Sequence, residues 1–511
     1  MAEWIIAELQ FKAIIYEDNR AVALYSGDIT KSDTNIPTEL IEELKSVTKV
    51  LEYDDPALKF FYPGTMDKQR DLIAMALYPL MYGKSRILPD KVIRLDEALR
   101  HAGQGEVIPI PQETGITRED IAWRVSARSD IQVRPYSRYF QILSTDWELG
   151  DDGRWHIATY INNLHPVKHR NIYNTIENIF NCIVPQLNMT MTPLKDMLHS
   201  RTRMEYHKVE YHPVPEEILA QTPQIQPREA QSEFYERLER WRMEHFRAVQ
   251  PDAGQFLPWA VPRCMVSKLP EDLTSVVRIE QPVDLSVDYK GRGLQVITRL
   301  LGVDLTPENP SYETDWHVEG QMNEHICAAA FINYENENVE DSYMEFRNII
   351  DADALSEVEH EPNDFVWLKQ VFGLENGEPA VQRTGSIYCK KGRAIIFPST
   401  VQHRMTQCEL KDKTKPGHTR SIVFYLVDPN MRIVSTANIP PQRLDWTLDM
   451  KEEDGDLRAT MEKVALDNMD KKGESPLSLR EAIEKRTQFL MDLHEFMRYQ
   501  HVAFESRILM L

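Results

Sequence analysis

The chain has 511 residues, of which 42% are hydrophobic, so it can bury a large core and is long enough for more than one domain-sized body. Its 80 acidic against 59 basic residues give a net charge of −21, which opposes binding to nucleic acid or to an anionic membrane surface. The five cysteines are scattered, without a C-x-x-C pair, which is typical of a reducing compartment. No stretch has the apolar length of a membrane span, so we expect a cytoplasmic protein.

The first part of the chain mixes helical and strand patterns. Thr38 opens a helical pattern, and apolar residues at helical spacing predict a second helix from Asp67 to Tyr82. Residues 140–161 alternate on both sides of Asp152-Gly153, which predicts a β-hairpin. We therefore expect residues 1–208 to form a mixed α/β region that packs on a core formed later in the chain.

The remaining sequence divides into four segments. Prolines make residues 209–231 a connector, and helical spacing favours a helical segment over 232–274. Residues 275–445 contain a succession of short strands, which predicts a sandwich or jelly roll; they are VVRIEQPVDLSV, LQVITRLL, DWHVEG, HICAAAFINY, YMEFRNII, SIYCKKGRAIIFP and RSIVFYLV. A capping box at Ser478 and Glu481 begins the helix expected within residues 446–511. The expected fold class is α+β, with a double-stranded β-helix (jelly-roll, cupin-like) core and helical additions at both ends.

Three residues of the strand region have the chemistry of metal ligands. His317 and Glu319 are two apart in DWHVEG, and the period of a strand places both side chains on one face. His403 follows the buried strand and turn GRAIIFPSTVQH, about eighty residues later. Two imidazoles and one carboxylate on one side of an iron leave the opposite positions open for oxygen and an organic ligand. The sequence therefore predicts an Fe(II) site at His317, Glu319 and His403.

Arg420 begins the next strong strand, HTRSIVFYLVDP, where Ile422 shares its face. An arginine fork in an apolar pocket is suited to a bidentate salt bridge with a carboxylate. This order of residues over about 315–430 resembles the Fe(II)- and 2-oxoglutarate-dependent oxygenases, in which an arginine near the distal histidine holds the cosubstrate. The resemblance implies that Arg420 binds 2-oxoglutarate, with Arg404 as the weaker rival. Glu319 replaces the commoner aspartate, and Ile422 replaces the hydroxyl of an Arg-x-Ser motif.

A longer resemblance covers most of the chain. The segments WHVEGQMNEHI, MEFR, GRAIIFPSTVQHRM and IPPQRLDW are similar to a fungal family long catalogued only as a domain of unknown function. The resemblance implies an iron oxygenase of secondary metabolism, in a family that includes enzymes oxidising amino acids, one type of which closes an aziridine ring on valine. In that class 2-oxoglutarate is decarboxylated to succinate while an unactivated carbon is oxidised.

The expected partners are a small-molecule substrate and dioxygen. Met344 and Phe346 lie on one face of YMEFRNII, so they are candidates for the substrate pocket, although core packing is the usual role of such residues. Asn323 and His325 follow the first two ligands and are candidates for residues that support them.

Three other functions fit parts of the same sequence. A metal-binding cupin enzyme would use the three ligands without 2-oxoglutarate and would not need Arg420. A non-enzymatic binding protein would use its acidic surface and leave the three ligands as ordinary polar positions. An oxygenase acting on a protein substrate would share the whole site. We find no G-x-S-x-G, Walker or H-E-x-x-H motif, so hydrolase, nucleotide-binding and zinc-protease signatures are missing.

Overall fold

The computed structural model describes residues 2–25, 28–52, 59–112, 136–195, 206–254, 256, 282–449 and 476–511. Within these residues, helices are combined with antiparallel sheets. The VVRIEQ part of the first expected strand lies outside the described residues, and the DLSV part was predicted wrongly, because Leu285–Asp288 is a short helix, α6, capped by the Asp284 side chain.

The largest sheet brings together strands from the two ends of the described chain. Its order is β1-β2-β16-β13-β19-β11-β4-β3, and β9 joins β11 and β10 beside this path. The bounds are β1 (Val22–Leu24), β2 (Ile29–Ser32), β3 (Phe60–Phe61), β4 (Gln69–Ile73), β9 (Thr145–Leu149), β10 (Trp155–Ile157), β11 (Leu294–Leu305), β13 (Ile326–Glu337), β16 (Ala394–Pro398) and β19 (Gly417–Val427). The N-terminal residues are therefore built into the same sheet as the strands of residues 275–445.

β4 corrects one prediction. The helix expected from Asp67 to Tyr82 is wrong, because Gln69–Ile73 is a strand that pairs with β3 and β11. Four of its five residues are buried. A short apolar run fits either a strand or a buried helix, and here the long-range pairing with β11 overrides the local spacing.

Other local predictions are confirmed. α2 begins at Thr38 and ends at Thr48, and β9 and β10 form the antiparallel hairpin around Asp152-Gly153. α10 (Leu479–Phe504) begins after Ser478, whose hydroxyl accepts the Glu481 N–H, while the Glu481 carboxylate accepts the Ser478 N–H.

A second, three-stranded sheet has the order β15-β14-β17. Its bounds are β14 (Tyr343–Ile349), β15 (Val381–Tyr388) and β17 (Gln402–Met405). Three two-stranded sheets pair β12 (Ser311–Tyr312) with β18 (Cys408–Glu409), β5 (Leu80–Met81) with β8 (Phe140–Gln141), and β6 (Arg86–Ile87) with β7 (Glu106–Val107).

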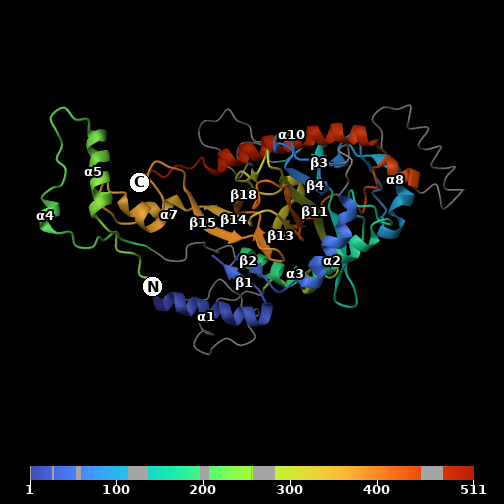
Figure 1. Cartoon of the computed structure of the whole chain (residues 1–511), viewed down its shortest axis with the longest axis horizontal. Helices are drawn as coiled ribbons and strands as arrows, with labels where there is room; N and C mark the ends of the chain where they lie inside the picture. Colours follow the sequence, from blue (N-terminus) through green and yellow to red (C-terminus); the bar gives the residue numbers. More distant parts are fainter. Residues whose placement is uncertain are drawn as a thin grey trace.

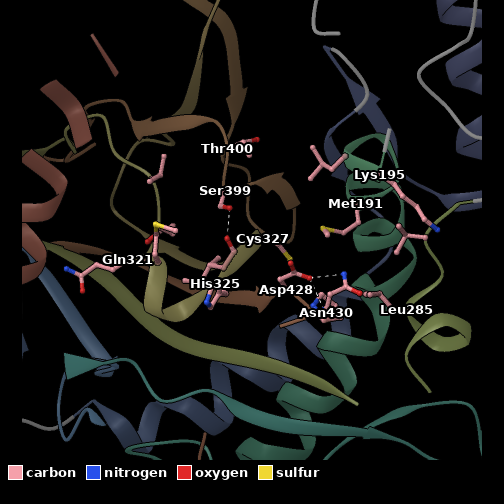
Figure 2. A pocket seen from close by; sticks show the side chains of 18 of the residues that line it. Met191, Lys195, Leu285, Gln321, His325, Cys327, Ser399, Thr400, Asp428 and Asn430 are labelled. Atoms are coloured by element: carbon pink, nitrogen blue, oxygen red, sulfur yellow. Dashed lines mark hydrogen bonds between the residues drawn. The ribbon is translucent and has the colours of Figure 1, made fainter. Parts of the chain in front are cut away.

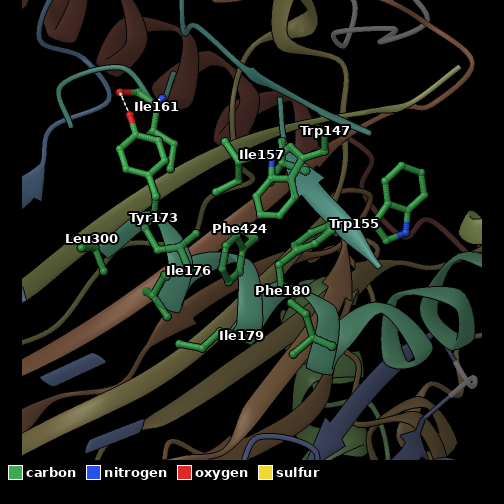
Figure 3. Packing of buried hydrophobic residues seen from close by; sticks show 14 of the residues in the cluster. Trp147, Trp155, Ile157, Ile161, Tyr173, Ile176, Ile179, Phe180, Leu300 and Phe424 are labelled. Carbon is green, nitrogen blue, oxygen red and sulfur yellow. Dashed lines mark hydrogen bonds between the residues drawn. The ribbon is translucent and has the colours of Figure 1, made fainter. Parts of the chain in front are cut away.

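The two faces of the large sheet have different coverings. On one face, α2 and α3 (Arg170–Met191) pack on it (Figure 1), and Ile176, Phe180 and other α3 residues meet Phe424 and Leu300 in the core shown in Figure 3. The other face contributes Val423, Tyr425 and Phe397 to a second core, which also contains the α10 residues Phe489 and Leu493. Side chains alternate across each strand, so neighbouring residues of β19 belong to different cores.

The remaining elements surround these layers, with α1 below the sheet and α4 and α5 at one end of the molecule in Figure 1. Their bounds are α1 (Ala2–Asn19), η1 (Lys49–Leu51), η3 (Leu95–His101), η4 (Pro193–Lys195), α4 (Glu216–Leu219), α5 (Gln231–His245), η6 (Met322–Glu324), α7 (Ala352–Ser356), η7 (Leu368–Phe372) and α8 (Leu444–Asp449). Among the residues that the structure describes, no helix combines the length and apolar character needed to cross a bilayer.

Candidate active site

His317, Glu319 and His403 meet at one place. The sequence predicted that His317 lies in a strand. It lies instead in an isolated antiparallel bridge with His403, the second residue of β17. Each backbone N–H of the bridge donates to the carbonyl of the other residue, at 3.1 and 3.0 Å. The two imidazole rings lie side by side, with centroids 4.4 Å apart. The bridge therefore fixes the two histidines relative to each other.

Glu319 completes the cluster. Its Oε1 lies 3.7 Å from His317 Nε2 and 3.5 Å from His403 Nε2. Potential ligand atoms of all three residues lie within 4.8 Å of one another. Adjacent ligands bound at ~2.1 Å to one ion lie ~3.0 Å apart, so small side-chain movements would let this set grip a metal.

The protonation of the cluster follows from its burial and mutual contacts. Burial would raise the pKa of the Glu319 carboxyl, but hydrogen bonds with the two histidines outweigh it and hold that pKa well below its usual range. Burial and the charge of His317 lower the pKa of His403 to about 4. His317 Nδ1 donates to the Asp315 carbonyl at 2.7 Å. Burial would lower the pKa of His317, but the Glu319 carboxylate raises it, so the proton on Nε2 that faces Glu319 has to leave when a metal binds there. A carboxylate and neutral imidazoles are the forms that bind metal.

A charged network lies beside Glu319 on the inner face of the large sheet. Arg299, on β11, donates from Nε and Nη2 to Asp71 Oδ1 at 2.9 and 2.7 Å. Arg486 of α10 donates to the other oxygen of Asp71 at 3.3 Å. Burial alone would lower the pKa of Arg299, but the charges of Asp71, Tyr425, Tyr62 and Glu319 raise it. Two buried guanidinium groups thus share one aspartate next to the metal-ligand cluster.

Tyr425 connects this network to the cluster. Burial and then the Glu319 charge raise the pKa of its hydroxyl well above the usual value, while Arg299 acts in the opposite direction. The sequence analysis missed Arg299 and Tyr425. The signal was available for Arg299, because a lone arginine in the apolar strand LQVITRLL is unusual, but β11 was not known to lie beside the ligands.

Arg420 does not lie where the sequence predicted, beside the three metal-ligand candidates. Its Nε and Nη2 donate to Glu52 at 2.9 and 2.8 Å, and its Nη1 donates to Asp304 Oδ1 at 2.7 Å. It shares the face of β19 with Ile422 and Phe424, which pack against α3, whereas Tyr425 is on the other face. The alternation of the strand therefore directs Arg420 away from His317, Glu319 and His403.

Arg404 also points away. It is next to His403 in β17, so its side chain is on the opposite face of the smaller sheet, where its Nε donates to Glu345 at 2.7 Å. Its guanidinium lies 4.9 Å from the centre of the Trp316 ring.

Met344 and Phe346 are buried on the inner face of β14. Phe346 is paired with His403 in the sheet, and their ring centroids are 6.5 Å apart. Phe346 also contacts the rings of Phe397 and Tyr25. Met344 is paired with Met405, one step farther from the ligands. Phe346 therefore supports His403 as part of the core, and neither residue is among those lining the pocket beside Glu319.

That pocket has a volume of about 590 Å³, which is the size of a small-molecule site. Glu319 lies in its wall, together with residues from the loop after Glu319, from α3 and η4, from α10 and from the end of β19 (Figure 2). Polar and charged members are Lys195, Gln321, His325, Ser399, Thr400, Asp428, Asn430 and Gln500. Asn323, in contrast, is bonded to the backbone of Ser137 and Phe140 and ties the loop to the preceding chain.

A second His/Glu cluster contains Glu335, Glu337 and His418. The Lys45 ammonium lies 3.0 Å from Glu335 Oε1, and His418 Nε2 lies 3.3 Å from the same oxygen. The Glu337 side chain is 68% exposed. Glu335 is already paired with a lysine, so this group is an ion-pair network at the edge of β13 and β19.

Comparison with known proteins gives the family. Residues 1–450 match the model described as "Protein of unknown function (DUF4246)". The chain belongs to this family. No curated protein matches it.

Solved structures show only distant likeness. A bsmA homolog from Methylobium petroleophilum has 10% identity and a TM-score of 0.16, over 26% of this chain and 41% of its own. The non-heme alpha ketoglutarate dependent epimerase SnoN from nogalamycin biosynthesis has 13% identity and a TM-score of 0.15, over 26% and 50%. EvdO2 from Micromonospora carbonacea var. aurantiaca has 11% identity and a TM-score of 0.14, over 26% and 52%. The chain thus spans about half, or less, of the length of these proteins.

Proposed function

We propose that this protein is an Fe(II)- and 2-oxoglutarate-dependent oxygenase that oxidises a small molecule with dioxygen. The observation that carries the proposal is the convergence of His317, Glu319 and His403, of which Glu319 is ionised and lies in the wall of a pocket. Two imidazoles and one carboxylate are the donor set that suits non-haem iron with open positions. Iron bound there would supply the oxygen-activating redox chemistry, with 2-oxoglutarate as the source of electrons.

The strand order supports the jelly-roll core expected for such an enzyme. β11, β19, β13 and β16 are consecutive in the large sheet, while the His317 bridge, β17, β14 and β15 are consecutive in the smaller one. Such an alternation of strands between two antiparallel sheets is expected of a double-stranded β-helix, and it supports our proposal of that core. The proposed ligands lie on the smaller sheet, and Arg299 and Tyr425 lie on the large one.

Arg299 is the residue we propose for the distal carboxylate of 2-oxoglutarate, in place of Arg420. Arg299 and Arg486 share the single carboxylate of Asp71, so once Glu319 is bound to a metal these two guanidinium groups would carry one positive charge more than Asp71 balances. A buried charge is stabilised by a counter-charge, and an incoming carboxylate would supply it. Tyr425 would orient the cosubstrate from the same face of the sheet.

The residues present also define what the chain itself contributes. The His317–His403 bridge sets the angle between two ligands, and the Asp315 carbonyl fixes the tautomer of His317. Apolar side chains such as Phe346 and Phe397 exclude water from one side of His403. The substrate would enter from the pocket on the side of Glu319.

For the substrate, the family resemblance supports a small molecule of fungal secondary metabolism, such as an amino acid. Hydroxylation, desaturation and ring closure, including aziridine formation, are the outcomes open to such chemistry. Because the pocket is a concave site of about 590 Å³ lined by side chains from several elements, a small molecule fits it better than a folded protein does.

A metal-dependent enzyme that works without 2-oxoglutarate is the second candidate. The observation that favours it is the pair of hydrogen bonds from Arg299 to Asp71, since an arginine already paired can serve packing alone. The experiment that decides uses anaerobically purified full-length protein with Fe(II), dioxygen and a panel of amino acids. We expect succinate to form only when 2-oxoglutarate is present. Substrate turnover that is unaffected by 2-oxoglutarate would favour the second candidate.

A further inference from the structure

One arginine interrupts the buried face of α10. The apolar residues of this face, Ala482, Phe489, Leu490 and Leu493, pack in the core that contains Tyr425. Arg486 lies among them and is only 7% exposed. Burying a guanidinium group costs free energy that an apolar side chain at the same position would not cost. The reason for a charge at this position therefore has to lie in what Arg486 contacts.

The Arg486 side chain ends beside the pair formed by Arg299 and Asp71. Its Nη2 donates to Asp71 Oδ2 at 3.3 Å and to the Phe61 carbonyl at 3.1 Å. Arg299 uses the other oxygen of the same carboxylate, because its Nε and Nη2 both donate to Asp71 Oδ1. Asp71 is 3% exposed, so salt and solvent screen these charges little. Two cations and one anion thus form one buried group.

The net charge of this group depends on Arg486. The other carboxylate that acts on Arg299 is Glu319, whose charge a bound metal would match. Burial raises the pKa of Tyr62 to about 12, so the Tyr62 hydroxyl beside the group stays neutral at pH 7. With Arg486 the group keeps one positive charge, whereas the Arg299–Asp71 pair alone would be neutral. Arg486 therefore supplies the charge that would draw an anion to Arg299.

We propose that Arg486 is a positioning residue for the cosubstrate, whose charge leaves the Arg299 guanidinium able to hold the distal carboxylate of 2-oxoglutarate although Arg299 is paired with Asp71. This proposal rests on the proposed function, which takes Arg299 as the anchor of that carboxylate. Arg486 lies beyond residues 1–450, which the family model matches. α10 would thus contribute to the candidate active site as well as to the core.

The test compares cosubstrate affinity with stability in the full-length protein. Equilibrium dialysis with Fe(II), without oxygen, measures binding of 2-oxoglutarate and of 2-oxopentanoate, which keeps the carbon chain but lacks the distal carboxylate. Thermal unfolding measures stability. Arg486→Gln removes one positive charge from the group, and Asp71→Asn removes its negative charge. Arg480→Gln is the matched control, because the Arg480 side chain is 91% exposed on the same helix.

We expect the two charge changes to act in opposite directions on affinity. Arg486→Gln should weaken binding of 2-oxoglutarate about tenfold, and Asp71→Asn should strengthen it. Both should lower the melting temperature, because each leaves a buried partner unmatched. Arg486→Lys keeps the charge and should restore most of the affinity. Arg480→Gln should leave the affinity unchanged, and 2-oxopentanoate should respond less than 2-oxoglutarate in every variant.

A purely structural role, in which Arg486 only ties α10 to the sheet, predicts a different pattern. Arg486→Gln would then lower the melting temperature without weakening 2-oxoglutarate binding at matched folded fraction, and this result would overturn the proposal. Asp71→Asn losing as much affinity as Arg486→Gln would also overturn it, because the charge of the group would not set the affinity. Wild-type protein that binds Fe(II) but not 2-oxoglutarate would overturn the proposed function and this inference together. Normal binding that is the same in all variants would overturn this inference alone.

Discussion

Two groups of histidine and glutamate lie on neighbouring parts of the strand region, and they differ in their surroundings. His317, Glu319 and His403 are joined by a backbone bridge and have no lysine or arginine within ion-pair distance in the part of the chain that the structure describes. Glu335 and Glu337, with His418, meet the Lys45 ammonium. Residue types are nearly the same in both groups. The presence of a cation decides that one group is a candidate metal site and the other an ion-pair network.

Two buried arginines give the same lesson. Arg420 has three carboxylate-directed hydrogen bonds, to Glu52 and Asp304, so its charge is fully matched. Arg299 and Arg486 share the single carboxylate of Asp71, so binding of Glu319 to a metal would leave one of the two positive charges unmatched. Both arginines occupy apolar strands, and only the face of the strand separates a structural role from a proposed cosubstrate role.

The largest effect should separate the two histidine clusters. Substituting His403→Ala removes one of three ligands, and we expect it to weaken Fe(II) or Co(II) binding by more than the roughly 100-fold that follows loss of a group bonded to a ligand. His418→Ala is the matched control and should leave metal affinity unchanged. Isothermal titration with metal measures both. Loss of metal affinity in His418→Ala but not in His403→Ala would place the metal at the second cluster.

The second largest effect is expected for Phe346, the aromatic residue that packs near His403. Phe346→Ala removes a fully buried ring that contacts Phe397, Tyr25 and His403, and we expect the free energy of unfolding to fall by about 3 kcal/mol. Denaturant unfolding measures this. If the product distribution also changes at matched folded fraction, Phe346 acts on the substrate as the sequence predicted. An unchanged distribution assigns Phe346 to packing.

The two arginines can be compared by the same substitution. Arg299→Lys keeps a charge but loses the fork, so we expect 2-oxoglutarate to bind about 10-fold to 100-fold more weakly. Arg420→Lys should lower the free energy of unfolding by about 1–3 kcal/mol, because carboxylates at Glu52 and Asp304 lose donors, but should leave 2-oxoglutarate affinity unchanged. Titration with 2-oxoglutarate in the presence of metal measures the affinity of both variants. If only Arg420→Lys weakens binding, Arg420 and not Arg299 holds the cosubstrate.

The smallest effect concerns the outer side of the candidate metal site. Arg347 donates hydrogen bonds to Gln402, which is next to His403, and to Glu505, the residue directly after α10. Its guanidinium also lies 4.7 Å from the ring centre of Trp316, which is next to His317. Arg347→Met should therefore weaken metal binding about tenfold by loosening both histidines. The exposed Arg498→Met, on α10, is the control. An altered Co(II) absorption spectrum in Arg347→Met alone would distinguish ligand positioning from a general loss of stability.

Local sequence patterns determined the parts of this protein that depend on short-range physics. The Ser478 and Glu481 capping box predicted the start of α10, and the Asp152-Gly153 turn predicted the hairpin of β9 and β10. The H-x-E pair and the later His403 indicated three side chains of metal-ligand type, because the period of a strand places His317 and Glu319 on one face. These features depend on a few neighbouring residues and the period of the backbone.

The tertiary structure alone decided what required long-range pairing. Gln69–Ile73 became a strand because β11 was available to pair with it, although its local spacing also fitted a helix. Arg420 was predicted beside the ligands, but the sheet directs its face toward Glu52 and Asp304 and places Arg299 of the adjacent strand beside Glu319. A strand repeats every two residues, so sequence gives which side chains share a face, while only the packing of α3 and α10 on opposite sides decides which face encloses the site.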